Sequence, residues 1–265
     1  MTDLSCGLSA ASLNAAATAG WYSAVAGLLS GFALLAILIP LDHTDDDCDS
    51  NDLSAGAEVF TAAFFTLLIL SLTYARLAGE TGADVDRGRL THEMMLNGAA
   101  LSMAALLLLF ALRSILGAYS AARALFVRAR GLILIATAVV GPVIALSSQF
   151  ASSLDLERYR IAAGRTTCEG ALPAGVAINL TILLAGWAII AGLWWQRRRI
   201  RLASAIPTVV ARTVLAFTVA VAVWTSVVVP LLDIEVATSP WFEHVVLAAT
   251  ALGGAAIAAA SWASR

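Results

Sequence analysis

Lysine is absent from this chain, and ionised side chains of any kind are scarce. All sixteen basic residues are arginines, and only 13% of the 265 residues are charged, against about 25% in soluble domains. Without a lysine there is no Schiff base for retinal, which excludes a retinal protein. A net charge of −2 gives no support to nucleic-acid binding, because the one basic cluster directly follows an apolar segment.

The motifs of common enzyme classes are missing as well. The sequence contains no H-E-x-x-H, G-x-S-x-G, P-loop or dinucleotide fingerprint. His43 and His92 fall in predicted loops, so only His244 is left for the paired histidines that haem needs across a membrane. Gly82-Ala83-Asp84 matches half of an aspartyl intramembrane protease motif, but it lies in a predicted loop without a second aspartate. We therefore predict a protein that is not an enzyme and binds no cofactor.

Apolar residues, in contrast, are abundant and clustered. They make up 60% of the chain, and the mean hydropathy is +0.86. A helix needs about 20 apolar residues to cross the hydrocarbon core of a bilayer. The apolar runs contain no stripe of polar residues at helical spacing, which excludes soluble amphipathic helices. They also lack the alternation of polar and apolar residues that strands of a membrane β-barrel need. The sequence predicts an all-α, polytopic transmembrane bundle that forms a single integral membrane domain over residues 1–265. Its seven spans are expected at 20–40, 55–77, 96–116, 131–150, 173–195, 209–232 and 241–261.

Arginines between the spans predict the orientation of the chain. With the N-terminus outside and the C-terminus inside, ten arginines face the cytoplasm and six face outwards, as the positive-inside rule favours. The cluster 197–201 follows Trp194 and Trp195, which gives an aromatic belt next to a basic anchor. The acidic loop 42–52 fits this orientation poorly, because it would lie inside. The first 19 residues hold no arginine, so the first span is expected to remain rather than to be cleaved as a signal peptide. We expect a bacterial inner or plasma membrane.

Cysteines and aspartates add two site hypotheses. In the predicted orientation Cys6 and Cys168 share the oxidising side, where they could form a disulfide; unpaired thiols are the alternative. Asp45, Asp47 and Asp49 match the first ligand positions of an EF-hand loop, which predicts a Ca²⁺ or Mg²⁺ site. The match ends there, because Ser50 and Gly56 replace the glycine and glutamate of that loop, and a solvated charge run is the favoured interpretation.

Polar residues inside the spans are the remaining candidates for function. Charged groups are costly in hydrocarbon and often mark ion or substrate pathways. The pathway candidates are Glu58, Arg113, Asn179, Glu243 and His244. The alternative is that such residues only hold helices together by hydrogen bonds. Because Glu243 and His244 are adjacent on a helix, they point about 100° apart and would not easily face one ligand.

Small residues and proline predict how the helices pack. Gly27 and Gly31 form a G-x-x-x-G pattern, and Gly253-Gly254 offers a second face on which helices can approach closely. Pro142, in the middle of the fourth span, removes a backbone hydrogen bond and predicts a kink.

Three functions remain open at this point. The protein is a channel or transporter subunit for an ion or small solute, a non-catalytic scaffold, assembly partner or sensor, or a metal-dependent enzyme that acts on lipid. Its expected partners are the lipid bilayer and either other membrane subunits or further copies of the chain, and not nucleic acid.

Overall fold

The computed structural model describes residues 15–42, 50–80, 87–118, 127–165, 173–200, 206–233, 236 and 238–263. Seven helices in this part of the chain are long and apolar enough to cross a membrane, and it contains no strand. The predicted all-helical, seven-span bundle is therefore confirmed, while its orientation in the membrane stays a prediction.

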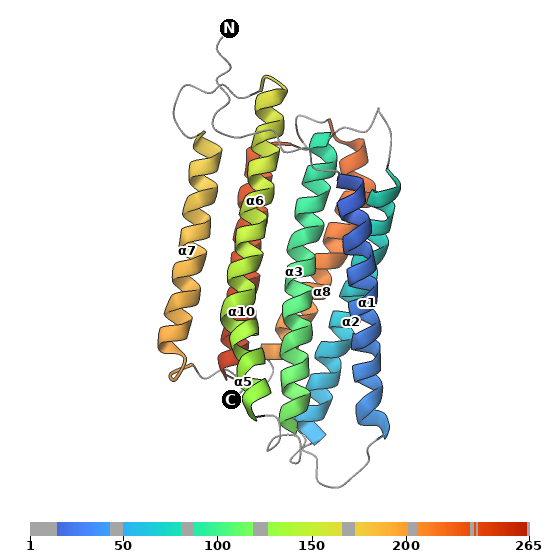
Figure 1. Cartoon of the computed structure of the whole chain (residues 1–265), viewed down its shortest axis with the longest axis vertical. Coiled ribbons are helices and arrows are strands. Elements are labelled where there is room, and N and C mark those ends of the chain that lie inside the picture. The colour runs from blue at the N-terminus through green and yellow to red at the C-terminus, as the bar shows by residue number, and fades with distance from the viewer. Residues whose placement is uncertain are drawn as a thin grey trace.

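The helices run alternately up and down (Figure 1). The first three are α1 (Ala15–Asp42), α2 (Ser50–Gly79) and α3 (Arg87–Ala118). The fourth span combines α5 (Val127–Ile135), the π-helical turn η1 (Ala136–Val140) and α6 (Gly141–Ala162). It is followed by α7 (Ala174–Gln196), by α8 (Ile206–Val223) with the turns η2 (Trp224–Val228) and η3 (Val229–Leu231), and by α10 (Pro240–Ala263). We call the end where α1 begins the upper face and the opposite end the lower face.

Helix α3 joins two groups of helices. Helices α1, α2 and α8 pack together on one side, and α6, α7 and α10 on the other, with α3 between them in Figure 1. Accordingly, α3 and α10 are the most buried of the seven, and α1 is the least buried. Several helices extend beyond the predicted spans, because charged residues near their upper ends are buried inside the bundle instead of marking the start of a loop.

Small side chains allow α1 to lie close to α2. The fully buried Ala19, Ala26 and Ala33 recur every second turn along α1. The hydroxyls of Ser23 and Ser71 each donate to the backbone carbonyl of the other residue, at 2.9 and 3.0 Å. A methyl group on Gly27 would lie 3.2 Å from Ser71 Oγ, whereas one on Gly31 would meet nothing within 4 Å. Only the first glycine of the G-x-x-x-G pattern is therefore needed for helix contact.

The glycine pair of α10 lies between two other helices. A Cβ atom on Gly253 would come within 2.6 Å of Met103 Sδ on α3, and one on Gly254 would lie 3.3 Å from Pro142 Cβ at the start of α6. The absence of both side chains lets α10 pack against α3 and α6 together, which explains its deep burial.

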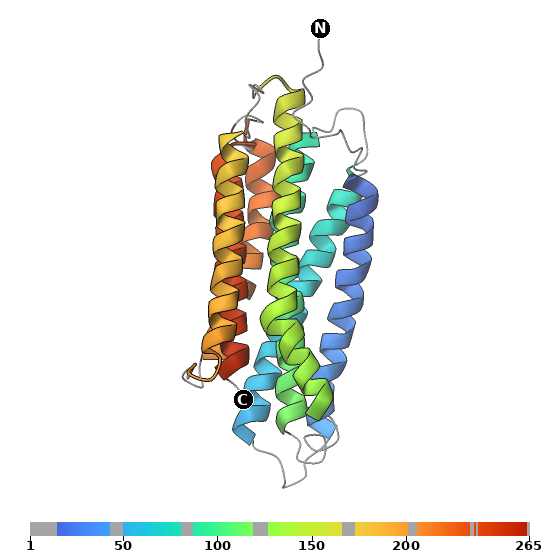
Figure 2. The ribbon, with the colours of Figure 1, turned by 60° about the vertical axis from the view of Figure 1, so that its left-hand side comes forward.

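Two spans contain a π-helical turn that ends two residues before a proline. In the fourth span the N–H of Gly141 donates to the carbonyl of Ala136, five residues back, and Pro142 has no N–H to offer. Residues 225–230 repeat the pattern T-x-V-V-x-P of residues 137–142, and there the N–H of Val229 donates to Trp224. At Pro142, where the sequence predicts a kink, the ribbon changes direction between α5 and α6 (Figure 2). After Pro230 the chain leaves the helix at Leu232.

We predict that Gly141→Ala destabilises the bundle by about 1–3 kcal/mol, the usual cost of overpacking. The new methyl group would lie 2.3 Å from Leu106 Cδ2 and 2.8 Å from the carbonyl oxygen of Ala136, which belongs to the π-helical turn. Thermal unfolding of the detergent-solubilised protein measures the effect. Gly131→Ala in the same span is the control, because its methyl group would meet nothing within 4 Å. Equal melting temperatures for the two variants would contradict the prediction.

Candidate functional site

Two groups of charged and polar side chains lie buried or partly buried near the upper face of the bundle. Ions in a low-dielectric interior need partners, since an unpaired buried charge costs several kcal/mol. We call the first group the Glu93 cluster (Arg76, Glu80, Arg89 and Glu93) and the second the Glu243 cluster (Glu157, Arg160, Asn179, Glu243 and His244). The pairing within each cluster decides what it can do.

Glu93 of α3 holds both of its carboxylate oxygens on arginines. Its side chain is fully buried, and Arg76 Nη2 of α2 lies 2.5 Å from Oε2 while Arg89 Nε lies 2.9 Å from Oε1. Glu80, at the end of the described part of α2, lies 3.4 Å from Arg89 and 3.7 Å from Arg76. Two cations thus face two carboxylates, and the cluster is electrically balanced.

Arg76 also binds a carbonyl that the π-helical turn of the sixth span has released. The carbonyl of Thr225 would normally accept from the N–H of Val229 or, in a π-helix, from residue 230. The first of these N–H groups goes to Trp224, and residue 230 is a proline. Arg76 Nη2 donates to this carbonyl at 2.9 Å instead. The arginine therefore connects α2, α3 and the upper end of the α8 span.

The Glu243 cluster is organised around Arg160 of α6. Its Nη1 atom donates to Glu157 at 2.6 Å, its Nη2 atom donates to Glu243 of α10, and its Nε atom donates to the carbonyl of Thr238 at 2.7 Å. Arg160, Glu157 and Glu243 are each at most 4% exposed. The guanidinium therefore fixes the upper end of α6 to the start of α10.

Asn179 brings α7 into the same cluster. Its amide Nδ2 donates to Glu243 Oε2 at 2.9 Å, and its Oδ1 lies 2.7 Å from His244 Nδ1. The two ends of one amide thus reach two adjacent residues, although these point in different directions from α10. Three of the five predicted pathway candidates therefore share one hydrogen-bonded chain.

Aromatic rings separate the two clusters. His92 of α3 is next to Glu93 in the sequence, but its ring packs edge-on against Phe242 of α10, with centroids 5.2 Å apart. Trp224 contacts the same Phe242 at 5.5 Å. These ring contacts join α3 and the end of the α8 span to α10, between the helices that carry Glu93 and Glu243.

The other two pathway candidates lie elsewhere. Glu58 pairs with Arg212 at 2.6 Å near the lower face, where their side chains are 40% and 71% exposed. Arg113 is buried and donates to the carbonyl of Ser261 at 2.6 Å. The five candidates therefore do not converge on one site.

The predicted metal and disulfide sites cannot be placed in the fold. Asp45, Asp47 and Asp49, as well as Cys6 and Cys168, lie outside the described residues. Within the part of the chain that is described, no group of His, Cys, Asp or Glu could hold a metal ion.

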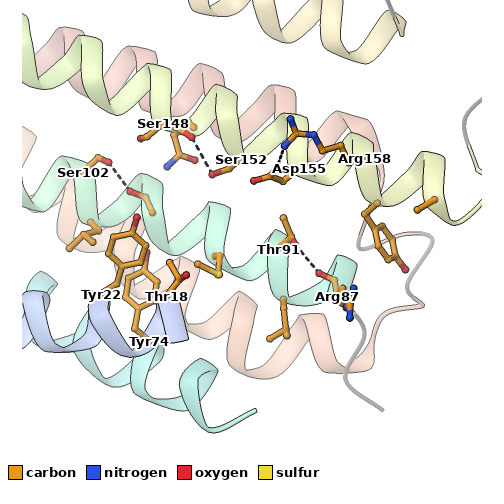
Figure 3. Close-up of a pocket in the computed structure, with 17 residues that line it drawn as sticks. Thr18, Tyr22, Tyr74, Arg87, Thr91, Ser102, Ser148, Ser152, Asp155 and Arg158 are labelled. Atoms are coloured by element: carbon orange, nitrogen blue, oxygen red, sulfur yellow. Dashed lines mark hydrogen bonds and ion pairs between the residues drawn. The ribbon is translucent and has the colours of Figure 1, made fainter. Parts of the chain in front are cut away.

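A cavity of about 370 Å³ lies beside α3 in the upper half of the bundle (Figure 3). We call it the α3–α6 slot, because these two helices form most of its wall, with contributions from α1 and α2. Its lining extends along α3 from Arg87 to Ser102, which corresponds to about 22 Å of helix. Charged residues lie at its upper end, and hydroxyl groups lie deeper: Arg87, Asp155 and Arg158, then Thr91, Ser102, Ser148 and Ser152.

The serine hydroxyls that line the slot donate their protons to backbone carbonyls and keep lone pairs with which they can accept hydrogen bonds. Ser102 donates to Gly98, Ser148 donates to Ala145 and Ser152 donates to Ser148, in each case to a backbone carbonyl of the same helix at 2.8–3.2 Å. Two of these bonds are drawn in Figure 3. Because a hydroxyl oxygen has two lone pairs, each can still accept from a bound molecule.

The sequence reasoning did not identify Glu93, Arg76, Arg160 or the slot. One usable signal was present: Arg89 and Glu93 are four residues apart, and Glu157 and Arg160 are three apart, which are pairing distances on a helix. These pairs fell just outside the predicted spans and were therefore assigned to loops. The slot left no comparable signal, because serine is common throughout the chain.

Comparison with protein families, curated proteins and solved structures finds no match to this chain. The interpretation of the site therefore depends on its geometry alone.

We predict that Glu93→Gln lowers the free energy of unfolding by about 3–5 kcal/mol, because it removes the fully buried carboxylate between Arg76 and Arg89 and leaves both guanidinium groups against the single carboxylate of Glu80. Denaturant unfolding in detergent micelles measures the loss. Glu58→Gln, which breaks an exposed pair, should cost about 1 kcal/mol or less and is the matched control. If both variants lost the same stability, the burial of Glu93 would have no energetic consequence.

Proposed function

We propose that this multi-pass membrane protein is a carrier, that is, a transporter subunit that binds a small solute in the α3–α6 slot. The observation that supports the proposal is a cavity of about 370 Å³ inside the bundle, lined by hydroxyl groups and reached by charged residues at one end. Ligand sites in proteins commonly enclose about 300–1,000 Å³ and carry a few polar groups on a largely apolar wall.

A carrier fits the geometry better than an open channel. The lining of the slot ends at Ser102, in the middle of α3, so the slot extends through only the upper half of the bundle and does not cross it. The buried charges of the two clusters are held by partners on neighbouring helices and are not directed into this cavity. A binding site that reaches one face at a time is what alternating access requires.

The wall of the slot includes a helix that has a built-in interruption. The π-helical turn η1 and Pro142 lie directly below Ser148 in the chain, so the upper part of the fourth span can change its angle without breaking a full set of helical bonds. Gly186 of α7 and Gly254 of α10 face this region, at Leu146 and Pro142. Movement of α6 at this point would open or narrow the slot.

The alternative is a sensor or assembly subunit in which the slot binds a ligand and stays open to one face. The paired clusters favour this alternative, since the Glu93 cluster fixes α2 to α3 and the Glu243 cluster fixes α6 to α10 at the upper face. The two functions differ in one respect: in a carrier the slot also becomes accessible from the lower face of the bundle, whereas in a sensor or assembly subunit it does not.

The carrier predicts that the slot is reached from both sides of the membrane. Ser148→Cys, in a chain whose three native cysteines are replaced by serine, should react with a membrane-impermeant thiol reagent in both right-side-out and inside-out vesicles. Mass measurement of the labelled protein gives the extent of reaction.

Two control positions show what no labelling and one-sided labelling look like in this experiment. Thr250→Cys on α10 is buried outside the slot and should remain unlabelled, and Arg198→Cys at the lower face is exposed and should react from one side only. Labelling of Ser148→Cys from one side only would support the sensor and contradict the carrier. Absence of labelling from either side would contradict a water-accessible slot.

We also predict that Pro142→Ala reduces the labelling of Ser148→Cys from the lower face, the side away from the opening of the slot, by about tenfold or more. Alanine restores the N–H donor and stiffens the fourth span. Pro230→Ala is the comparison, since Pro230 lies at the end of its span and outside the wall of the slot. Equal effects of the two substitutions would contradict a hinge at Pro142.

A further inference from the structure

We infer that the α3–α6 slot takes an amphiphile with an acidic headgroup, a lipid that carries an exposed phosphate, and that this molecule enters sideways from the bilayer. The inference deepens the proposed function and rests on the same slot, but the binding of the lipid does not require that the lipid is transported. Four observations lead to this ligand: charge, position, the side opening and an unpartnered hydroxyl.

Among the described residues, the upper end of the slot carries an excess of positive charge. Arg87 is exposed at the first residue of α3, and it has no acidic partner among the described residues. Arg158 pairs with Asp155 through Nη1 at 2.5 Å, while its buried Nε has no hydrogen-bond partner there. Two guanidinium groups thus face one carboxylate. A phosphate bound here would accept charge-assisted hydrogen bonds from both arginines.

The same position is favourable for an anion because α3 begins there. The helix dipole places partial positive charge at the N-terminal end of a helix. Gly88 follows Arg87, and a Cβ atom on it would lie 2.3 Å from Tyr159 Cε1 of α6. The ring of Tyr159 therefore packs directly on the start of α3, beside the charged residues, and closes the upper part of the slot around a headgroup.

Helices α1 and α6 both line the slot but are not packed against each other, and from this we infer that the slot opens to the side between them. Helix α3 forms its floor, while Thr18 and Tyr22 of α1 and the residues of α6 line its two edges. Figure 2 shows α6 and α1 on opposite sides of this region. Met94 and Leu101 on the floor are apolar and only partly buried. A hydrocarbon chain that leaves the bilayer would cover them.

An unpartnered hydroxyl lies deep in the slot. Tyr74 of α2 lines the cavity, is 0% exposed, and its hydroxyl has no hydrogen-bond partner in the described structure. Its ring packs at 5.3 Å against Tyr22, which is itself half exposed at the edge of the slot. A buried hydroxyl without a partner costs about 1–3 kcal/mol. The hydroxyl lies beside Gly98, about 16 Å along α3 from Arg87, so a ligand must occupy the length of the slot to reach it.

A free inorganic anion fits these observations less well. It would use the arginines at the upper end, but it would leave Met94, Leu101 and the Tyr74 hydroxyl without contacts. The slot extends for about 22 Å along α3, far more than a single anion needs. The length and the apolar floor therefore favour an amphiphile over a soluble phosphate.

Native mass spectrometry of the full chain in detergent tests the inference. The probes are dioleoyl phosphatidic acid, dioleoyl phosphatidylcholine and glycerol 3-phosphate, which separate the exposed phosphate from the lipid chains. We expect phosphatidic acid to bind at least tenfold more tightly than either of the other two. The double variant Arg87→Gln/Arg158→Gln should lose about tenfold or more of this affinity. The control Arg198→Gln/Arg212→Gln removes two arginines near the lower face and should leave the affinity unchanged.

A second variant tests the lower part of the slot without touching the arginines. Leu101→Trp places a large ring on the floor and should weaken phosphatidic acid binding while thermal unfolding stays close to that of the native protein. Equal binding of phosphatidic acid and phosphatidylcholine would overturn the headgroup assignment. Glycerol 3-phosphate that binds as tightly as the lipid would overturn entry from the bilayer, as would full lipid affinity in Leu101→Trp.

The outcome for the lipid site is separate from the outcome for the carrier. Selective lipid binding together with one-sided labelling of Ser148→Cys would keep the site and reject transport. Two-sided labelling without lipid selectivity would keep the carrier and reject this ligand.

Discussion

The arrangement of the bundle depends on one constraint: every ionised group that is buried among these helices must find a partner, either on its own helix or on a neighbouring one. Glu93 meets this requirement through Arg76 and Arg89, and Glu243 meets it through Arg160 and Asn179. Because the bonds of Arg76 to Glu93, and of Arg160 and Asn179 to Glu243, link different spans, the upper face is fixed by specific contacts. Apolar packing alone would allow many helix rotations. The same contacts leave the slot between α3 and α6 as a separate region with its own polar groups.

The two prolines add a second constraint, which acts on the backbone. A π-helical turn before each proline leaves one carbonyl without its usual donor, and the structure treats the two positions differently. At Thr225 the carbonyl is bound by Arg76, so the upper end of the sixth span is fixed. At Pro142 the turn lies in the middle of a span, beside the glycines of α7 and α10. One motif therefore anchors a helix end in one span and provides a bend in the other.

The candidate site was only partly predictable from sequence, for physical reasons that differ between residues. Asn179, Glu243 and His244 stood out because polar groups inside apolar segments are costly, and the structure brings them together. Glu58 and Arg113 stood out for the same reason, but they bind Arg212 and a backbone carbonyl in separate places. Arg160 and Glu93 were overlooked, because charged residues near a span end resemble loop residues until helix packing buries them. The slot depends on side-chain directions from four helices, which no single segment encodes.

The sequence by itself determined the solvent of the protein, the helical class and the number of spans, because the length and apolarity of a segment decide whether it can cross hydrocarbon. Only the tertiary structure decided which charges pair, which carbonyl Arg76 captures and where a cavity remains. These features depend on the rotation of each helix about its axis and on its neighbours, and hydrophobicity, being nearly uniform around these helices, carries no information about either.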